Sequence, residues 1–305
     1  MVSFYGNMMN FIFRCMPQYK PGQPHDYAAE RKRNDRTPPK PPRGVVVKQI
    51  TLGGLTGEEI SKAGNNNGII LYIHGGGFTV GSARERRAIC QYIAANYGFD
   101  CVTFNYRLAP ENLWPAPLDD SLTAYIELIE RGISPQNIVL MGESAGGTLT
   151  LSLAVKLKEM QLPQPKAIAA FSPCVTVAET LPSHVENSKT DYMLTDGVAN
   201  GRIKIVFGDR ADDEALLHMP TVSPLYADFD GLPPVFLSAS DTEALLDDSI
   251  MLLEKLSKAG HKTELDIQHG VCHAFQVFTD MPEAKRSLKK TFEFLEKNNE
   301  SLSSN

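Results

Sequence analysis

The sequence predicts an α/β protein in which a central, mostly parallel β-sheet is flanked by helices. Short apolar segments with β character alternate with longer segments whose apolar residues recur at helical spacing. Two of the short segments end in glycine-rich runs, at residues 74–77 and 142–147. Such alternation is typical of a parallel sheet covered on both faces, with its functional groups on loops at the carboxyl ends of the strands.

Length and composition are those of an ordinary globular protein. The chain has 305 residues, of which 42% are hydrophobic and 22% charged, and its formal net charge is −6. This length fits one large domain better than two. The negative charge provides no field that would attract nucleic acid, so we expect none to bind. No uninterrupted apolar run of about 20 residues occurs, so we expect no stable membrane insertion.

Cysteine usage and the amino-terminal sequence indicate the compartment. The five cysteines are scattered, odd in number and without paired spacing, which predicts free thiols rather than disulfides or a zinc site: Cys15, Cys90, Cys101, Cys174 and Cys272. The apolar start at residues 1–16 lacks the flanks of a secretory signal. We therefore expect a cytoplasmic protein that needs no cofactor, with a homodimer as a possible assembly.

The first 44 residues differ from the rest of the chain. Apolar residues recur there at helical spacing and a proline-rich connector follows at residues 38–42; the apolar residues are Phe4, Met8, Phe11, Ile12 and Cys15. This pattern predicts an amphipathic helix on a linker. The apolar stripe could anchor the helix to a membrane surface, but the flanks lack a basic face, which favours packing over the rest of the protein.

The predicted sheet begins at residue 45. A strand over 45–52, a turn at Gly53–Gly54 and a second short strand form a hairpin. Leu118, Leu122 and Tyr125 share one face of a helix over 117–131, which Gly132 is placed to end. A further helix is expected over 248–259. The remaining predicted strands cover residues 68–73, 100–105, 138–141, 167–171, 234–239 and 262–268.

Ser144 is the candidate nucleophile. The strand over 138–141 runs into Gly142-Glu143-Ser144-Ala145-Gly146 and then into a nearly all-apolar helix. A tight strand-to-helix turn leaves no room for side chains beside the serine, which is why glycines flank it in a nucleophile elbow. The alternative is a glycine-rich turn that only caps a helix. The buried strand before it favours the nucleophile.

The run at residues 74–77 is the candidate oxyanion hole. His74-Gly75-Gly76-Gly77 follows a predicted strand, where glycines let backbone N–H groups approach a developing oxyanion. We expect the amides of Gly75, Gly76 and Ala145 to form the hole. A phosphate-binding loop is the alternative, but no Gly-Lys-Ser/Thr follows the run.

The general base is expected after the nucleophile, because the triad order in a strand-turn-helix fold of this kind is Ser, acid, His. His273 lies in the loop after the last predicted strand, and His269 at the end of that strand is the rival. The loop after residues 234–239 offers Asp241 and Glu243 as the acid, and the chemistry of the residues alone does not separate them.

With these residues identified, the chain resembles the hormone-sensitive-lipase-like carboxylesterases of the α/β-hydrolase fold. The resemblance rests on His-Gly-Gly-Gly at 74–77, Tyr-Arg-Leu-Ala-Pro-Glu at 106–111, Gly-Glu-Ser-Ala-Gly-Gly at 142–147, and His273 followed by Ala-Phe. The family's Asp-Pro-x-x-Asp acid motif falls on residues 243–247. The resemblance therefore implies Glu243, in place of the usual Asp, as the acid.

The resemblance also implies a helical cap over the active site. It would consist of residues 1–44 and an insertion at about 179–220, and residues 45–305 would form the catalytic domain. The apolar stripe of the first helix would then roof an acyl pocket, with Phe78, Met193 and Phe207 as candidate lining residues. Arg107 and Glu111 are expected to brace the loop under the site.

The predicted function is hydrolysis of small-molecule, short- to medium-chain carboxylic esters. Ser144 would attack the ester, His273 would move the proton and Glu243 would orient His273. A ligand receptor of the same architecture is the rival from another class, and the presence of all three residues argues against it. An amidase with the same machinery is the second rival.

Overall fold

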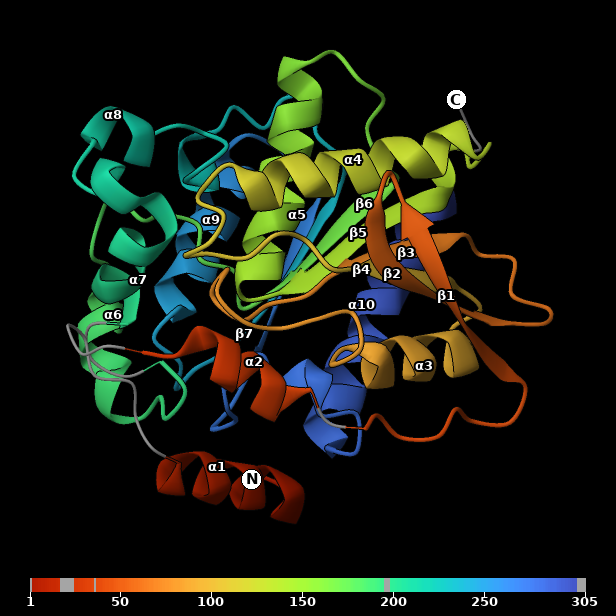
Figure 1. The fold of residues 1–305 in the computed structure, drawn as a ribbon, viewed down its shortest axis with the longest axis horizontal. Coiled ribbons are helices and arrows are strands. Elements are labelled where there is room, and N and C mark those ends of the chain that lie inside the picture. Colours follow the sequence, from red (N-terminus) through yellow and green to blue (C-terminus); the bar gives the residue numbers. More distant parts are fainter. Residues whose placement is uncertain (1, 17–24, 36, 195–197, 301–305) are drawn as a thin grey trace.

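A single mixed β-sheet runs through the middle of the protein (Figure 1). The structure is a computed structural model and describes residues 2–16, 25–35, 37–194 and 198–300. Within these residues the strands are β1 (Val45–Leu52), β2 (Leu55–Lys62), β3 (Ile69–Ile73), β4 (Asp100–Phe104), β5 (Ile138–Glu143), β6 (Ala167–Phe171), β7 (Val235–Ser240) and β8 (Thr263–Gln268). Their order in the sheet is β1-β2-β4-β3-β5-β6-β7-β8.

The sheet is parallel from β4 to β8, as the alternation in the sequence predicts. β1 pairs antiparallel with β2, and β2 pairs antiparallel with β4. All the other neighbours pair in parallel, with β5 in the centre between β3 and β6. Because β3 and β5 are parallel neighbours, the loops after Ile73 and Glu143 leave the same edge of the sheet. These are the loops that carry the two glycine-rich runs.

Helices cover both faces of the sheet (Figure 1). One face packs on α4 (Ala116–Glu130), α5 (Ala145–Glu159) and α9 (Leu246–Lys258), and the other packs on α3 (Arg87–Asn96) and α10 (Pro282–Glu300). The central strands are buried on both sides because alternate residues point to opposite faces. In β3, Leu71 and Ile73 contribute to one apolar cluster, while Ile70 and Tyr72 contribute to the other.

Local turns follow the glycines of the sequence. The predicted hairpin forms with Leu52 opposite Leu55, and its two turn residues, Gly53 and Gly54, both have positive φ. That is the requirement of the two-residue turn whose twist matches a hairpin. α4 ends where the sequence predicts, since Gly132 adopts a φ of 88° and Ile133 N donates to Leu128 O at 3.1 Å.

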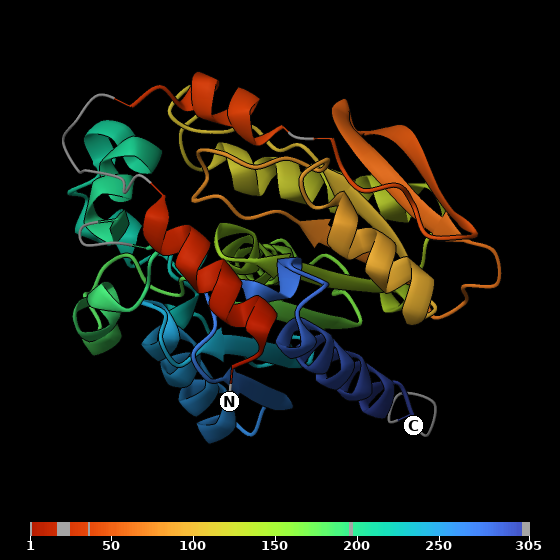
Figure 2. The same cartoon turned by 90° about the horizontal axis from the view of Figure 1, so that it is seen from below.

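The helices outside the sheet layers lie along one side of the molecule (Figure 2). Two come from the N-terminal segment, α1 (Phe4–Cys15) and α2 (Tyr27–Asn34). Three lie in the long connection from β6 to β7, and we call them the insertion helices: α6 (Pro182–Glu186), α7 (Val198–Phe207) and α8 (Glu214–Leu217). α1 lies between the insertion helices and the start of α10, where Ser3 Oγ donates to Glu283 Oε2 at 2.8 Å.

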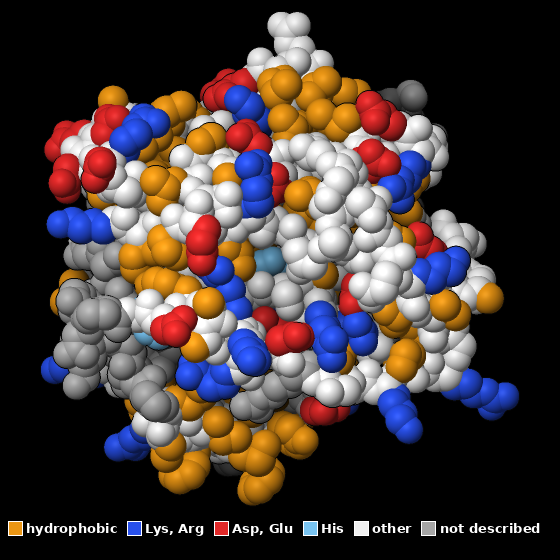
Figure 3. All heavy atoms as spheres, in the orientation of Figure 1, with side chains coloured by type: hydrophobic (Ala, Val, Ile, Leu, Met, Phe, Trp, Pro, Cys, Tyr) orange, Lys and Arg blue, Asp and Glu red, His pale blue; other side chains and the backbone are white. Residues whose placement is uncertain are grey.

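The orientation expected for α1 is wrong. Its apolar stripe points to solvent, because the Phe4 side chain is 82% exposed and Phe11 67%. The opposite face packs instead, with Val2 and Met9 in an apolar cluster with Val271, Phe275 and other residues near His273. Apolar side chains accordingly gather at the lower edge of Figure 3, where α1 lies. α1 therefore covers the loop of the expected base and does not turn its stripe toward an acyl pocket.

Candidate active site

The nucleophile elbow is a sharp turn between β5 and α5. Ser144 has a φ of 55° and a ψ of −126°, a conformation that L-residues adopt only where the surroundings impose it. A Cβ on Gly142 would lie 2.6 Å from Ile73 O, and one on Gly146 only 2.0 Å from that oxygen. The flanking glycines are therefore required by close approach of β3. Ser144 is partly exposed among buried neighbours.

In the loop after β3, one of the three amides expected in the oxyanion hole makes a different hydrogen bond. Gly75 N donates to Glu143 Oε1 at 2.6 Å in a fully buried position. Its N–H is thus already occupied and cannot also point at a substrate oxygen, so the expected role of Gly75 is wrong. Gly76 and Gly77 follow in partly exposed positions with φ values of 108° and 58°, which glycine adopts without strain. A Cβ on Gly75 would come within 3.0 Å of Ser144 Cβ, so this loop lies directly against the nucleophile.

Glu143 holds the loop and the elbow together. Its side chain is 1% exposed, and besides the Gly75 amide it accepts from Arg86 Nε at 2.5 Å and from the Tyr72 hydroxyl at 2.8 Å. Burial lowers the pKa of Arg86 by itself, but the charge and hydrogen bond of Glu143 outweigh burial and raise it. Burial and the Glu143 charge raise the pKa of Tyr72, which keeps its hydroxyl a donor. These residues were not singled out from the sequence, although Glu143 lies within the serine motif.

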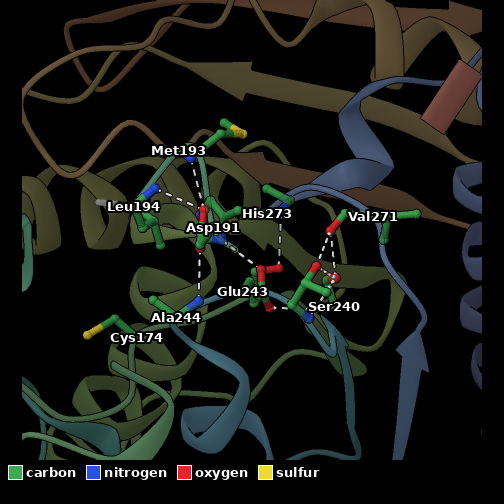
Figure 4. A network of polar contacts seen from close by, with 12 residues as sticks. Cys174, Asp191, Met193, Leu194, Ser240, Glu243, Ala244, Val271 and His273 are labelled. Carbon is green, nitrogen blue, oxygen red and sulfur yellow. Dashed lines mark hydrogen bonds and ion pairs between the residues drawn. The ribbon is translucent and has the colours of Figure 1, made fainter. Parts of the chain in front are cut away.

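His273 and Glu243 form a buried pair. His273 Nδ1 lies 2.8 Å from Glu243 Oε2, and the two side chains are 3% and 0% exposed. Figure 4 shows the two side chains facing each other beside Ser240, whose amide donates to Glu243 Oε1 at 3.2 Å. With Nδ1 occupied, the Nε2 atom of His273 is the ring nitrogen left to handle a proton. Among the described residues it has no hydrogen-bond partner.

The rival acid and base pair with each other instead. His269 Nδ1 contacts Asp241 Oδ2, and Asp241 Oδ1 accepts from Gly270 N at 2.7 Å. The His269 side chain is 78% exposed. The two carboxylates that the sequence left open are thus separated by their partners, since Glu243 contacts the buried imidazole and Asp241 the exposed one.

The electrostatics favour a protonatable His273. Burial by itself lowers its pKa, but the hydrogen bond and negative charge of Glu243 more than offset burial, so the pKa lies above the ordinary value of 6.5. Asp191 and Glu143 act in the same direction through their charges. An imidazole in this setting is stabilised when it takes up a proton from a nucleophile.

The Ser144 turn and the His273 loop are both held at the carboxyl end of β6. Ser144 N donates to Phe171 O at 2.8 Å, and Ala274 N donates to Ser172 Oγ at 3.2 Å. Adjacent residues of one strand end therefore hold the elbow and the His273 loop. No hydrogen bond between Ser144 and His273 is present among the described residues. Such bonds are often long until substrate binds.

The loop over residues 105–115 braces the site as expected. Arg107 pairs with Asp120 of α4, with Nη2 and Oδ1 2.8 Å apart. Glu111 pairs with Arg31 of α2 at 2.8 Å. Arg31 also donates to Thr79 O at 2.7 Å and to Ala109 O at 2.6 Å. Arg31 thus joins the N-terminal segment to the chain just after the three glycines, a contact that no sequence pattern indicated.

Two of the three expected pocket residues share one apolar cluster. Phe78 and Phe207 both pack on Trp114, with ring centroids 5.8 and 6.0 Å away. This cluster joins α7 to the loop after β3. Met193 lies apart from it, on the chain segment that follows Asp191. Phe78 follows directly on Gly77, so the Trp114 cluster borders the glycine-rich loop after β3.

The described residues contain no cluster of metal-binding side chains and no membrane-spanning helix. No group of three or more His, Cys, Asp or Glu side chains is arranged to hold a metal ion. In the same part of the chain, none of the helices has the length and apolar character needed to cross a membrane. All five cysteines are unpaired thiols.

Comparison with known proteins gives the family. Residues 70–277 match the alpha/beta hydrolase fold family. An esterase of Acinetobacter venetianus is 34% identical over 251 residues, which cover 82% of each chain. The carboxylesterase/phospholipase LipF of Mycobacterium tuberculosis is 31% identical and is aligned over 84% of this chain and 70% of its own.

Solved structures agree with the same class. The esterase EstE5, in crystals soaked with p-nitrophenyl butyrate, superposes with a TM-score of 0.87 at 29% identity over 97% of this chain and 99% of its own. An esterase from the bacterial hormone-sensitive lipase family gives 0.88 at 28% identity, over 98% and 99% of the two chains. The chain belongs to the α/β-hydrolase family. The prediction of a carboxylic ester hydrolase is thereby confirmed at the level of enzyme class.

Proposed function

We propose that this protein is a serine carboxylesterase in which Ser144, His273 and Glu243 form the catalytic triad. The observation that carries the assignment is the buried contact of 2.8 Å between His273 Nδ1 and Glu243 Oε2, at the strand ends that also hold the Ser144 elbow. Esterases among the relatives and structural neighbours support the same reaction.

The proposed reaction proceeds through an acyl-enzyme. Ser144 Oγ attacks the ester carbonyl while His273 Nε2 takes its proton, and Glu243 holds the imidazolium by accepting from Nδ1–H. When the tetrahedral intermediate collapses, the same proton passes to the leaving alcohol. Water, deprotonated by His273, then attacks the acyl-enzyme, and His273 returns that proton to Ser144 Oγ as the bond to the acyl group breaks and the carboxylic acid leaves.

The oxyanion that forms in both steps needs N–H donors. We propose the amides of Gly76, Gly77 and Ala145, with Gly77 in place of Gly75. Supporting this set, the first two lie on the loop packed against Ser144, and Ala145 is the first residue of α5, where the helix dipole favours negative charge. Removing one such donor typically costs about 3 to 4 kcal/mol of transition-state stabilisation.

The decisive assay compares p-nitrophenyl esters of graded acyl length with wild type and Ser144→Ala. Removing the nucleophile of a triad costs up to about a millionfold in kcat. We expect the variant to lose at least several thousandfold on every ester. A loss below about a hundredfold would refute Ser144 as the nucleophile. The same series tests the proposed preference for short- to medium-chain esters, and matched anilides test the amidase alternative.

The division into a cap and a catalytic domain is also a proposal. The cap would comprise residues 1–44 and about 179–220, with the catalytic domain over 45–305. Its support is the packing of α7 on the loop after β3 and of α1 on the loop of His273.

We also propose a cytoplasmic location and a homodimeric assembly. The unpaired state of all five thiols, including exposed Cys15, supports a cytoplasmic location. Cell fractionation tests the location. Sedimentation velocity tests whether the protein forms a homodimer.

A further inference from the structure

A second buried carboxylate lies beside the proposed triad. Asp191 belongs to the connection between β6 and β7, just before the Met193–Leu194 segment, and only 4% of it is exposed. Its Oδ1 accepts from Met193 N and Leu194 N, both at 2.9 Å, and its Oδ2 accepts from Ala244 N at 2.8 Å. Every one of these partners is a backbone N–H, so both oxygens of the carboxylate act as acceptors.

The hydrogen bond from Ala244 N joins the insertion to the loop of Glu243. Ala244 follows Glu243, so Asp191 fixes the peptide next to the triad acid (Figure 4). Two neighbouring contacts act on the same loop, because Asn187 Nδ2 donates to Glu243 O at 2.9 Å and Thr190 Oγ1 donates to Thr242 O at 3.0 Å. Hydrogen bonds from residues 187–191 therefore hold the acid loop.

The charge of Asp191 raises the pKa of His273, in addition to the charges of two other carboxylates. The charged groups that act on His273 are Glu243 from the acid loop, Glu143 from the end of β5 and Asp191 from the insertion. Cys272, the neighbour of His273, stays a neutral thiol because burial, followed by the Asp191 charge, raises its pKa to about 12. A negative charge at Asp191 favours the imidazolium form of His273.

We propose that Asp191 is a positioning residue of the reaction, which holds the acid loop through Ala244 N and stabilises the imidazolium of His273 with its charge. This inference rests on the proposed triad. The insertion would then help to position Glu243 and to stabilise protonated His273, in addition to covering the site.

The test is the pH profile of kcat/KM for p-nitrophenyl butyrate with Asp191→Asn and a matched control. The amide removes the charge and cannot keep all three accepted hydrogen bonds. We expect the acid limb to move to lower pH, and the plateau to fall by on the order of tenfold to a hundredfold as the acid loop loosens. Asp191→Glu, which keeps the charge on a longer side chain, should lose part of the plateau but keep the wild-type acid limb.

The control is Asp247→Asn. Asp247 Oδ2 accepts from Ser183 N at 2.8 Å, so it also ties the insertion to the acid region, but its charge is not among the largest effects on the pKa of His273. We expect its acid limb to match wild type. An unchanged limb in Asp191→Asn, or equal shifts in both variants, would overturn the proposal.

Folding is checked by far-UV circular dichroism and thermal melting. If Asp191→Asn does not fold, Asp191→Ser serves as a second variant. It removes the same charge, but its hydroxyl can still accept one hydrogen bond. Failure of both to fold would leave Asp191 a purely structural residue and overturn the proposal. The proposed triad is tested apart from this, because activity that survives Ser144→Ala would refute the triad whatever Asp191→Asn shows.

Discussion

At the scale of single residues, the choice of the acid that contacts His273 shows what the residue types alone can predict. Asp241 and Glu243 are both carboxylates on one loop, and their chemistry alone favours neither for contact with His273. Resemblance to a family pointed to Glu243. The structure then separates them physically, because Glu243 is buried with His273 while Asp241 accepts from Gly270 N and contacts exposed His269.

Glutamine at position 243 should nearly abolish activity. Glu243→Gln cannot stabilise the imidazolium and can hold the wrong tautomer of His273, so we expect kcat to fall by about 10³ to 10⁴. Asp241→Asn is the matched control, and we expect it to stay within about threefold of wild type. Steady-state kinetics on p-nitrophenyl butyrate measures both. A larger loss in Asp241→Asn than in Glu243→Gln would reverse the assignment.

The pH dependence of the wild type follows from His273. Only the neutral imidazole can take the proton of Ser144, so activity is present above the His273 pKa and is lost as the pH falls through it. Burial lowers this pKa, but the hydrogen bond and charge of Glu243 raise it further than burial lowers it. We therefore expect the acid limb of kcat/KM to lie above pH 6.5, the ordinary histidine value. A limb at clearly lower pH would mean that burial, rather than Glu243, controls His273.

The oxyanion loop marks a limit of residue-level prediction. Glycines at 75, 76 and 77 look equivalent in the sequence, yet Gly75 N is occupied by Glu143. That contact joins residues 68 positions apart, and the pairing of β3 beside β5 creates it. Local sequence could identify the run but could not say which amide is used.

At the scale of elements, the strands of the sheet were predictable, whereas the inner face of α1 and the existence of α2 were not. The predicted strands and the end of α4 are confirmed, because buried apolar runs and glycine turns are local signals. For α1 the periodicity predicts a helix correctly but suggests the wrong inner face. Its inner face is fixed by specific contacts, such as Asn10 Nδ2 donating to Gly270 O at 2.7 Å.

The sequence did not predict α2. Its sequence is strongly polar and none of its residues is buried, so it lacks the apolar periodicity by which a helix is predicted. The element is anchored by Arg31, whose guanidinium contacts Thr79 O, Ala109 O and Glu111. Contacts of this kind depend on the tertiary structure and leave no pattern in the sequence.

Loss of the Arg31 contacts should impair catalysis more than stability. Arg31→Ala releases the chain after the three glycines, so we expect kcat to fall roughly tenfold, less than the removal of one oxyanion donor. Arg33→Ala on the same helix is the control, because Arg33 is exposed, and it should behave as wild type. Kinetics and thermal melting measure the two effects. Equal kcat in the two variants would show that α2 does not support the oxyanion loop.

At the scale of the whole molecule, the parallel sheet explains why residues so far apart in the chain meet. β3, β5, β6 and β7 are parallel neighbours, so the loops after them leave one edge of the sheet. Those loops carry the glycines at 75–77, Ser144, Ser172 and Glu243, and the loop after β8 carries His273. The N-terminal segment and the insertion then contact this same edge from outside, through Arg31 and Asp191.

The central claim is that ester hydrolysis passes through an acyl group on Ser144. The most direct measurement is rapid-mixing kinetics with p-nitrophenyl butyrate, combined with peptide mass mapping of the protein quenched during the reaction. We predict a burst of p-nitrophenol of about one equivalent per active site when deacylation is the slower step, and a butyryl group on the peptide that contains Ser144. Hydrolysis with the acyl group on another residue, or undiminished hydrolysis by Ser144→Ala, would contradict the account.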